Sequence, residues 1–136
     1  MVEIEVEYSG GLRCTSRHGP SGTTISTDAP KDNEGRGESF SPTDLLATSL
    51  ATCMLTTMGI VARRKGWNFD GARARVEKHM VADPLRRIAR LPVRIEMPRG
   101  LPADSRPVLE KTALTCPVHV SVNPGIERPV TFVYPD

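Results

Sequence analysis

The sequence predicts an α+β fold in which antiparallel sheets pack around a long central helix. Segments near both ends of the chain alternate apolar and polar residues with the period of two that half-buried strands show. Between them no charged residue interrupts the chain from Leu45 to Ala62, which indicates a buried helix. A chain of 136 residues suits one domain with its own core, so we expect a single domain over residues 1–136.

Three strands are expected before the central helix. In the first of them, Val2, Ile4, Val6 and Tyr8 alternate with glutamates, so one face is apolar and half-buried. Turns containing glycine and proline separate this strand from two further segments of strand-like composition. A polar, glycine-rich loop then leads to the helix. The expected elements are strands at 2–8, 12–18 and 23–27, and the loop at 30–37.

The central helix has start and stop signals in the sequence. Ser41 is expected at the N-cap, with Pro42 and Asp44 at the first and third helical positions of a capping box. Basic residues at 63–65 suit a helix C-terminus, and Gly66 is the expected stop. Apolar residues surround the helix, so we expect burial on most sides, which a homodimer would provide. One face would carry Leu46, Leu50, Cys53, Thr57 and Val61.

A β-hairpin, two helical pieces and a last strand are expected after the central helix. Pro92 predicts an edge position or a bulge in the second strand of the hairpin. Asp104 or Ser105 is expected to cap the first helical piece. Pro117 disfavours helical geometry at Cys116, which would make Cys116 the N-cap of the second piece. The expected ranges are 69–80 and 87–97 for the hairpin, 104–115 and 117–122 for the helices, and 130–134 for the strand.

Composition narrows the classes of function. Lys and Arg total 18 against 16 Asp and Glu, and the net charge of +2 is no argument for nucleic acid. Arginines gather along the hairpin, but acids interleave with them and stacking aromatics are absent, so no nucleic-acid partner is expected. Three cysteines without a C-x-x-C pair argue against a secreted disulfide framework. Without an apolar signal region, and with hydroxyl residues throughout the central helix, we expect a cytoplasmic protein and no membrane partner.

The cysteines are the candidate reactive residues. Cys53 lies in mid-helix with no cation within one turn, so burial alone would raise its pKa. Cys116, at a helix N-terminus, is placed for thiolate formation. Simple core packing is the alternative for both, and Cys14 shows no partner signal. A metal site built from Cys116, His119, Cys53 and His79 lacks any paired-ligand motif, and neither metal nor cofactor is expected.

Two motifs resemble the OsmC/Ohr family, in a less-characterised branch. They are residues 37–47 (GESFSPTDLLA), with Cys53 following in the helix, and residues 116–119 (CPVH) after the second helix. The resemblance covers essentially the whole chain as a single OsmC-like domain. It implies an intertwined homodimer with two active sites at the subunit interface. It also implies a thiol-dependent peroxidase that reduces organic hydroperoxides, and in part hydrogen peroxide, at the expense of a dithiol reductant.

The resemblance assigns roles to both cysteines. Cys53 matches the peroxidatic cysteine, which would be oxidised to a sulfenic acid, and Cys116 matches the resolving cysteine. This differs from the local argument, which favours Cys116 as the more acidic thiol. A stress-response or small-molecule-binding protein with little peroxidase turnover is the alternative function.

The family site also contains an arginine, which stabilises the thiolate, and a glutamate, which orients that arginine. Arg36 and Glu38 are the candidates in this chain, with Arg17 and Asp44 as alternatives. The best-known family members carry glutamate directly after the proline that starts the helix. This chain has Thr43 at that position.

Overall fold

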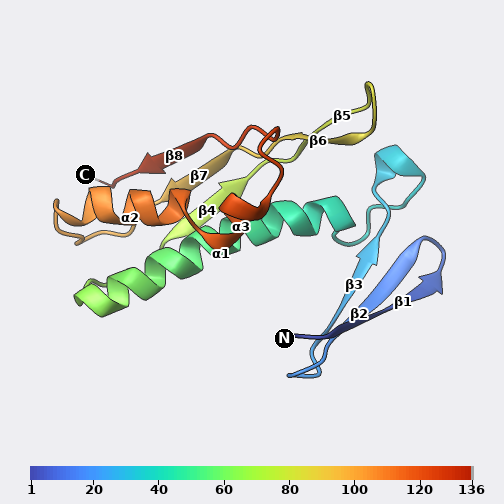
Figure 1. Ribbon diagram of the computed structural model, residues 1–136, viewed down its shortest axis with the longest axis horizontal. Helices are drawn as coiled ribbons and strands as arrows, with labels where there is room; N and C mark the ends of the chain where they lie inside the picture. Colours follow the sequence, from blue (N-terminus) through green and yellow to red (C-terminus); the bar gives the residue numbers. More distant parts are fainter. Residues whose placement is uncertain (136) are drawn as a thin grey trace. The chain divides into compact units, whose positions relative to one another are not determined.

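The computed structural model describes residues 1–135, which form two compact units divided at Leu45 and Leu46. Figure 1 shows the elements in chain order. The first unit contains a three-stranded sheet, and the second contains the remaining strands and most of the central helix. The order of strands and helices agrees with the α+β class that the sequence predicts.

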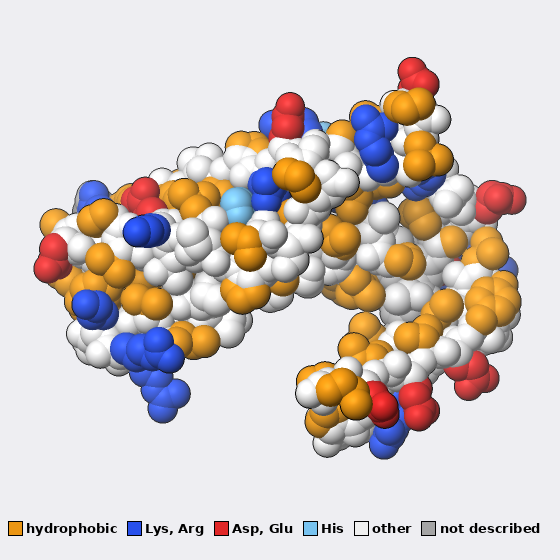
Figure 2. Space-filling model, viewed as in Figure 1, with side chains coloured by type: hydrophobic (Ala, Val, Ile, Leu, Met, Phe, Trp, Pro, Cys, Tyr) orange, Lys and Arg blue, Asp and Glu red, His pale blue; other side chains and the backbone are white. Residues whose placement is uncertain are grey.

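The first unit is an antiparallel sheet in the order β1-β2-β3. All three predicted strands are confirmed, as β1 (Ile4–Gly10), β2 (Arg13–His18) and β3 (Thr24–Asp28). A short 3-10 helix, η1 (Lys31–Asn33), lies in the predicted loop. The expectation that β1 is half-buried is wrong for the single chain, because every residue of β1 is exposed. Hydrophobic side chains can be seen on the surface of this unit in Figure 2.

Helix α1 (Pro42–Lys65) has the predicted bounds. The capping box is confirmed, because the backbone N–H of Asp44 donates to Ser41 Oγ at 3.1 Å and that of Ser41 donates to Asp44 Oδ2 at 2.9 Å. Gly66 follows with φ of +74°, the left-handed geometry of a helix stop. The single chain buries one face of the helix, whereas the sequence predicts burial on most sides. The residues of the buried face are Ala47, Leu50, Ala51, Met54, Met58 and Ala62.

The predicted hairpin of the second unit is present but broken in the middle. The outer half pairs β5 (His79–Val81) with β6 (Arg87–Arg90), and the inner half pairs β4 (Arg73–Val76) with β7 (Val93–Glu96). The break in the second arm falls at Leu91 and Pro92, consistent with the irregularity expected at a proline. Strand β8 (Val130–Val133) pairs with β7 in parallel, which the sequence pattern did not indicate. The three-stranded sheet therefore has the order β4-β7-β8.

Two helices complete the second unit, α2 (Ser105–Leu114) and α3 (Pro117–Ser121). Asp104 occupies the N-cap of α2 without a side-chain capping bond. Cys116 is the N-cap of α3, as predicted, with extended φ and ψ of −64° and 152°. Figure 1 shows α1 and α2 along one side of the β4-β7-β8 sheet. The buried core between them includes Leu50, Met54, Met58, Leu91, Val93, Ile95, Leu109, Ala113 and Cys116.

Candidate active site

The two cysteines singled out by the sequence meet in the second unit. Cys53 is half-buried on α1 and packs against the core cluster that contains Cys116. The Cys53 side chain lies near enough to Cys116 to raise the pKa of its thiol, and both thiols are free. Thr57 donates its hydroxyl to the Cys53 carbonyl at 2.9 Å, one turn further along the helix. Helix α1 and the cap of α3 therefore hold two thiols in contact, in surroundings that are mainly apolar.

Burial raises the pKa of the Cys116 thiol, and the neighbouring Cys53 side chain raises it further. The N–H groups of α3 act in the opposite direction, and the nearest comes from His119, which donates to Cys116 Sγ at 3.3 Å. The helix N-terminus does not lower the pKa of Cys116 below its ordinary value, because only 1% of the residue is exposed and desolvation outweighs the N–H groups. Cys116 is thereby kept in its protonated form, which suits a resolving thiol better than an attacking one.

His119 does not supply a cation to this pair. Burial lowers the pKa of its imidazole, and the charge of Arg128 lowers it further, so the ring is neutral at physiological pH. The Arg128 guanidinium donates to the His119 carbonyl and, at 3.1 Å, to the carbonyl of Ile126. These bonds fix the short helix α3 and hence the cap position of Cys116.

The first unit holds a cluster of ion pairs that includes both charged candidates. Glu38 contacts Arg13 at 3.1 Å and Arg36 at 3.8 Å. Arg13 also reaches Asp28, at 3.5 Å, and the side chain of Asp28 is only 2% exposed. The backbone N–H of Glu38 donates to Asp28 Oδ2 at 3.0 Å, so the buried carboxylate fixes both the arginine and the chain at Glu38. The arrangement is an arginine oriented by acids, with Arg13 held more closely than Arg36.

The loop before the helix is ordered by a close approach of its own backbone. A side chain at Gly35 would place its first carbon 1.7 Å from the carbonyl oxygen of Ala29, so only glycine fits there. The N–H groups of Gly35 and Gly37 donate to the carbonyls of Pro30 and Ala29 at 2.9 and 3.2 Å. This ordered loop fixes the backbone just before Glu38, whose side chain contacts Arg13 and Arg36.

Sequence reasoning missed Arg13 and Asp28. The signal that identifies them is strand register, because Arg13 on β2 lies directly opposite Asp28 on β3. Of the alternatives that the sequence left open, Asp44 is engaged in the capping box, and Arg17 makes no ion pair within residues 1–135. Across the same residues, no group of three or more His, Cys, Asp or Glu side chains could hold a metal ion.

The sequence profile described as OsmC-like protein matches residues 35–128. This chain belongs to the OsmC-like protein family. The matched region contains both the helix-start motif and the Cys-Pro motif of α3. A comparison with curated protein sequences found no match.

Solved structures of OsmC-like proteins share the fold over nearly the whole chain. A candidate osmotic stress induced and detoxification response protein from Psychrobacter arcticus 273-4 is 46% identical, with a TM-score of 0.91 over 97% of this chain and 96% of that one. An organic hydroperoxide resistance protein OsmC from Legionella pneumophila is 16% identical, with a TM-score of 0.77 over 98% and 96% of the two chains. The organic hydroperoxide resistance protein OhrB of Bacillus subtilis is 14% identical, with a TM-score of 0.69 over 97% of each chain.

Family membership also bears on the apolar helix. OsmC-like proteins are soluble and typically dimeric. Among residues 1–135, α1 alone is long and apolar enough to cross a membrane, a test that the core helix of a soluble protein also passes. In an OsmC-like protein, α1 is therefore read as a core helix.

Proposed function

We propose that this OsmC-like protein is a thiol-dependent peroxidase that reduces organic hydroperoxides. The observation that supports the proposal most directly is the contact between Cys53 and Cys116, two free thiols on separate helices. Two cysteines that meet in a reduced protein can pass through a disulfide without large movement. The relatives named for organic hydroperoxide resistance support the same chemistry through the shared fold.

In the proposed cycle Cys53 is the peroxidatic residue. Its thiolate attacks the terminal oxygen of the hydroperoxide, the O–O bond breaks, and the products are a Cys53 sulfenic acid and, after protonation, an alcohol. The Cys116 sulfur then displaces the sulfenic hydroxyl, which leaves with a proton as water, and a Cys53–Cys116 disulfide forms. A dithiol reductant restores both thiols and is itself oxidised to a disulfide. The high pKa of Cys116 favours this order, because Cys116 stays protonated until Cys53 has been oxidised.

The charged cluster of the first unit is proposed to assist this cycle. Arg36 or Arg13 would stabilise the thiolate and the developing negative charge on the leaving oxygen, and Glu38 would orient the guanidinium. Glu38 contacts both arginines, which fits an orienting role. The chain has Thr43 where the best-known relatives carry glutamate, so Glu38 and Asp28 are the acids available beside an arginine in this cluster.

The active form is proposed to be a cytoplasmic homodimer. In β1 the apolar side chains of Ile4, Val6 and Tyr8 are 60%, 63% and 64% exposed, and in β3 Ile25 is 48% exposed. The strand register places these side chains on one face of the β1-β2-β3 sheet. A second copy of the chain would cover this face, and a reducing compartment would keep the three cysteines free.

Oxidation by cumene hydroperoxide tests the cycle. Stopped-flow measurements should show rapid oxidation of the parent protein, and mass spectrometry after one equivalent should find a Cys53–Cys116 disulfide. Cys116→Ser should be oxidised at the first step but accumulate sulfenic or sulfinic acid at Cys53. Cys14→Ser is the matched control and should behave like the parent. If Cys53→Ser is oxidised as fast as the parent, the peroxidase proposal is wrong.

The same assay assigns the charged residues. Glu38→Gln and replacement of the working arginine, Arg36→Gln or Arg13→Gln, should each slow oxidation by about 10²-fold, the usual cost of losing one charge-stabilising group. Arg64→Gln, which removes an exposed arginine outside the cluster, is the control and should leave the rate unchanged. Equal rates for all four variants would show that the cluster has no part in the reaction.

The second candidate is a stress-response or small-molecule-binding protein without efficient turnover. Thr43 at the usual glutamate position favours it, as does the name of the 46% identical relative, which refers to osmotic stress and detoxification. A disulfide that forms with cumene hydroperoxide but is not reduced by any dithiol, including dihydrolipoamide, would favour this candidate over the peroxidase.

A further inference from the structure

The solvent face of the β4-β7-β8 sheet carries an unfavourable pair of like charges. Arg75 on β4 lies directly opposite Arg94 on β7, and both side chains are exposed. At the next pair on the same face, two residues along, Arg73 lies opposite Glu96, which is the arrangement expected for stability. Like charges in directly opposed positions of a sheet destabilise it. A ligand that binds both guanidinium groups would offset the repulsion between Arg75 and Arg94.

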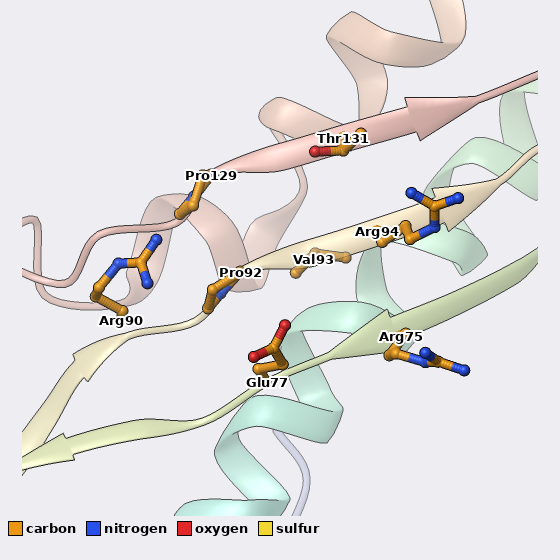
Figure 3. Close-up of a pocket in the computed structure, with 8 residues that line it drawn as sticks. All are labelled: Arg75, Glu77, Arg90, Pro92, Val93, Arg94, Pro129 and Thr131. Atoms are coloured by element: carbon orange, nitrogen blue, oxygen red, sulfur yellow. The ribbon is translucent and has the colours of Figure 1, made fainter.

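A groove of about 430 Å³ lies along this face. Figure 3 shows Arg75 and Arg94 extending toward the same end, with Arg90 at the other end and Glu77 between them. The groove is lined by Arg75, Glu77, Arg90, Pro92, Val93, Arg94, Pro129 and Thr131. Its volume falls in the range of sites for small molecules.

The arginines in this groove differ in how closely their guanidinium groups are paired with carboxylates. Arg90 is bound by Glu127, with Nε and Oε2 2.8 Å apart. Arg94 reaches Glu96 only at 4.0 Å, and Arg75 makes no ion pair with any residue in the described range 1–135. Thr131 on β8 lies beside Arg94 in the parallel register and adds an exposed hydroxyl donor. Arg75, Arg94 and Thr131 thus offer a row of donors across three adjacent strands.

The donor set suits a phosphate group. A smaller depression of about 180 Å³ continues the groove over Arg73, Arg75, Arg94 and Glu96. Across both, four arginines face two lining glutamates, and Glu127 pairs with Arg90, which leaves a net excess of one positive charge to attract an anion. Guanidinium forks bind phosphate oxygens in pairs. No aromatic residue lines either depression, so the face lacks the stacking platforms of a nucleic-acid surface.

We propose that this groove binds a phosphorylated small molecule, with the phosphate between Arg75 and Arg94 and the Thr131 hydroxyl as a further donor. The site is separate from the thiol pair. Val93 and Ile95, which alternate with Arg94 on β7, point to the opposite face of the sheet and join the core against which Cys53 packs. Binding at this groove does not depend on the peroxidase proposal.

Calorimetric titration with pyrophosphate at low ionic strength tests the site. Saturable binding with one site per chain is expected. Arg75→Gln and Arg94→Gln should each weaken binding by about 10-fold or more, because each removes a charge-assisted pair of hydrogen bonds. Arg64→Gln is the matched control: it removes the same charge from an exposed position at the end of α1 and should change affinity less than about 2-fold. Arg94→Lys should recover part of the affinity.

The proposal is overturned if pyrophosphate does not saturate the protein, or if Arg64→Gln weakens binding as much as Arg94→Gln, which would indicate bulk charge alone. Citrate and a single-stranded oligonucleotide serve as competitors. Tighter binding of citrate would assign the groove to carboxylates, and tighter binding of the oligonucleotide would assign it to nucleic acid; either result contradicts a phosphate site. Unliganded Arg75→Gln should also melt at a higher temperature than the parent, since the like-charge pair is removed.

Discussion

The two units of this protein differ in how far they bury their apolar side chains. In the second unit Leu50, Met54 and Met58 are 0% exposed and form a core with the sheet and α2. In the first unit the apolar side chains of β1, such as Val6 at 63%, remain largely exposed. A three-stranded sheet needs a covered hydrophobic face for stability. The second unit therefore supplies its own core, and the first unit needs another surface to cover its apolar face.

The candidate thiols and the candidate charged residues lie in different units. The second unit holds the two thiols in mainly apolar surroundings, and the first holds an arginine bound by two acids, Arg13 with Asp28 and Glu38. Apolar packing protects a thiol from water but disfavours the thiolate, whereas a charged cluster favours an anion. In the proposed peroxidase neither set of residues suffices alone.

The largest expected effect is the loss of stability when a core side chain of the second unit is truncated. Leu50→Ala should lower the free energy of unfolding by about 2–5 kcal/mol, because it leaves a cavity at a fully buried position. Ile4→Ala in β1, where the side chain is 60% exposed, should cost less than half as much. Urea denaturation at several protein concentrations provides the measurement. An equal and concentration-independent loss at Ile4 would show that the contrast between the units is wrong.

The next largest effect is expected on dimer formation through the apolar face of the first unit. Val6→Glu places a charge in the apolar face of the sheet and should weaken the proposed homodimer by about 10²-fold or more, the cost of burying an unpaired charge. Light scattering should then show a shift from twice 14.9 kDa toward 14.9 kDa. Thr15→Lys is the control, because it adds a charge on the opposite face, where Thr15 pairs with Glu7. A parent protein that is monomeric at all concentrations would remove the basis for this prediction.

A smaller effect is expected at the start of α1. Ser41→Ala should lower the free energy of unfolding by about 1 kcal/mol, because the N–H of Asp44 loses its acceptor. Asp44→Ala should have a comparable effect through the N–H of Ser41. Thr52→Ala is the control, since its hydroxyl bonds only to carbonyls of its own helix and the side chain is exposed. Thermal unfolding provides the measurement. If Thr52→Ala loses as much stability as the other two variants, the contribution of the capping box is contradicted.

The smallest effect follows from the raised pKa of Cys116. In a Cys14→Ser variant, which keeps Cys53, alkylation of Cys116 by iodoacetamide, followed by peptide mass spectrometry, should reach half its maximal rate above the ordinary thiol pKa of about 8.5. The folded protein favours the protonated thiol, so this stabilisation is complete below the unfolded pKa and is lost as pH rises through the higher folded pKa. The free energy of unfolding should therefore fall in alkaline solution. A half-maximal rate below about 8 would contradict the burial argument.

Local signals in the sequence account for what could be predicted. Capping residues and Gly66 specify the ends of α1, and Pro117 specifies Cys116 as an N-cap, because these depend on backbone chemistry within a few residues. The alternation of β1 likewise specifies a strand. The OsmC-like motifs lie in these same segments, so the family and the two cysteines could be found from sequence.

Contacts between distant residues could not be predicted in this way. An apolar circumference gives no preference among the faces of α1, and packing against the sheet selects the one with Met54 rather than the one with Val61. Strand register brings Arg13 to Asp28, and Arg75 to Arg94, at positions that alternation alone does not pair.

The sequence by itself determined where elements begin and end and which thiols could react, because capping, turn and strand preferences act over a few residues. Only the tertiary structure decided that Cys53 and Cys116 meet and that burial holds the pKa of Cys116 above its ordinary value. Desolvation depends on everything packed around a group, and no local pattern records it.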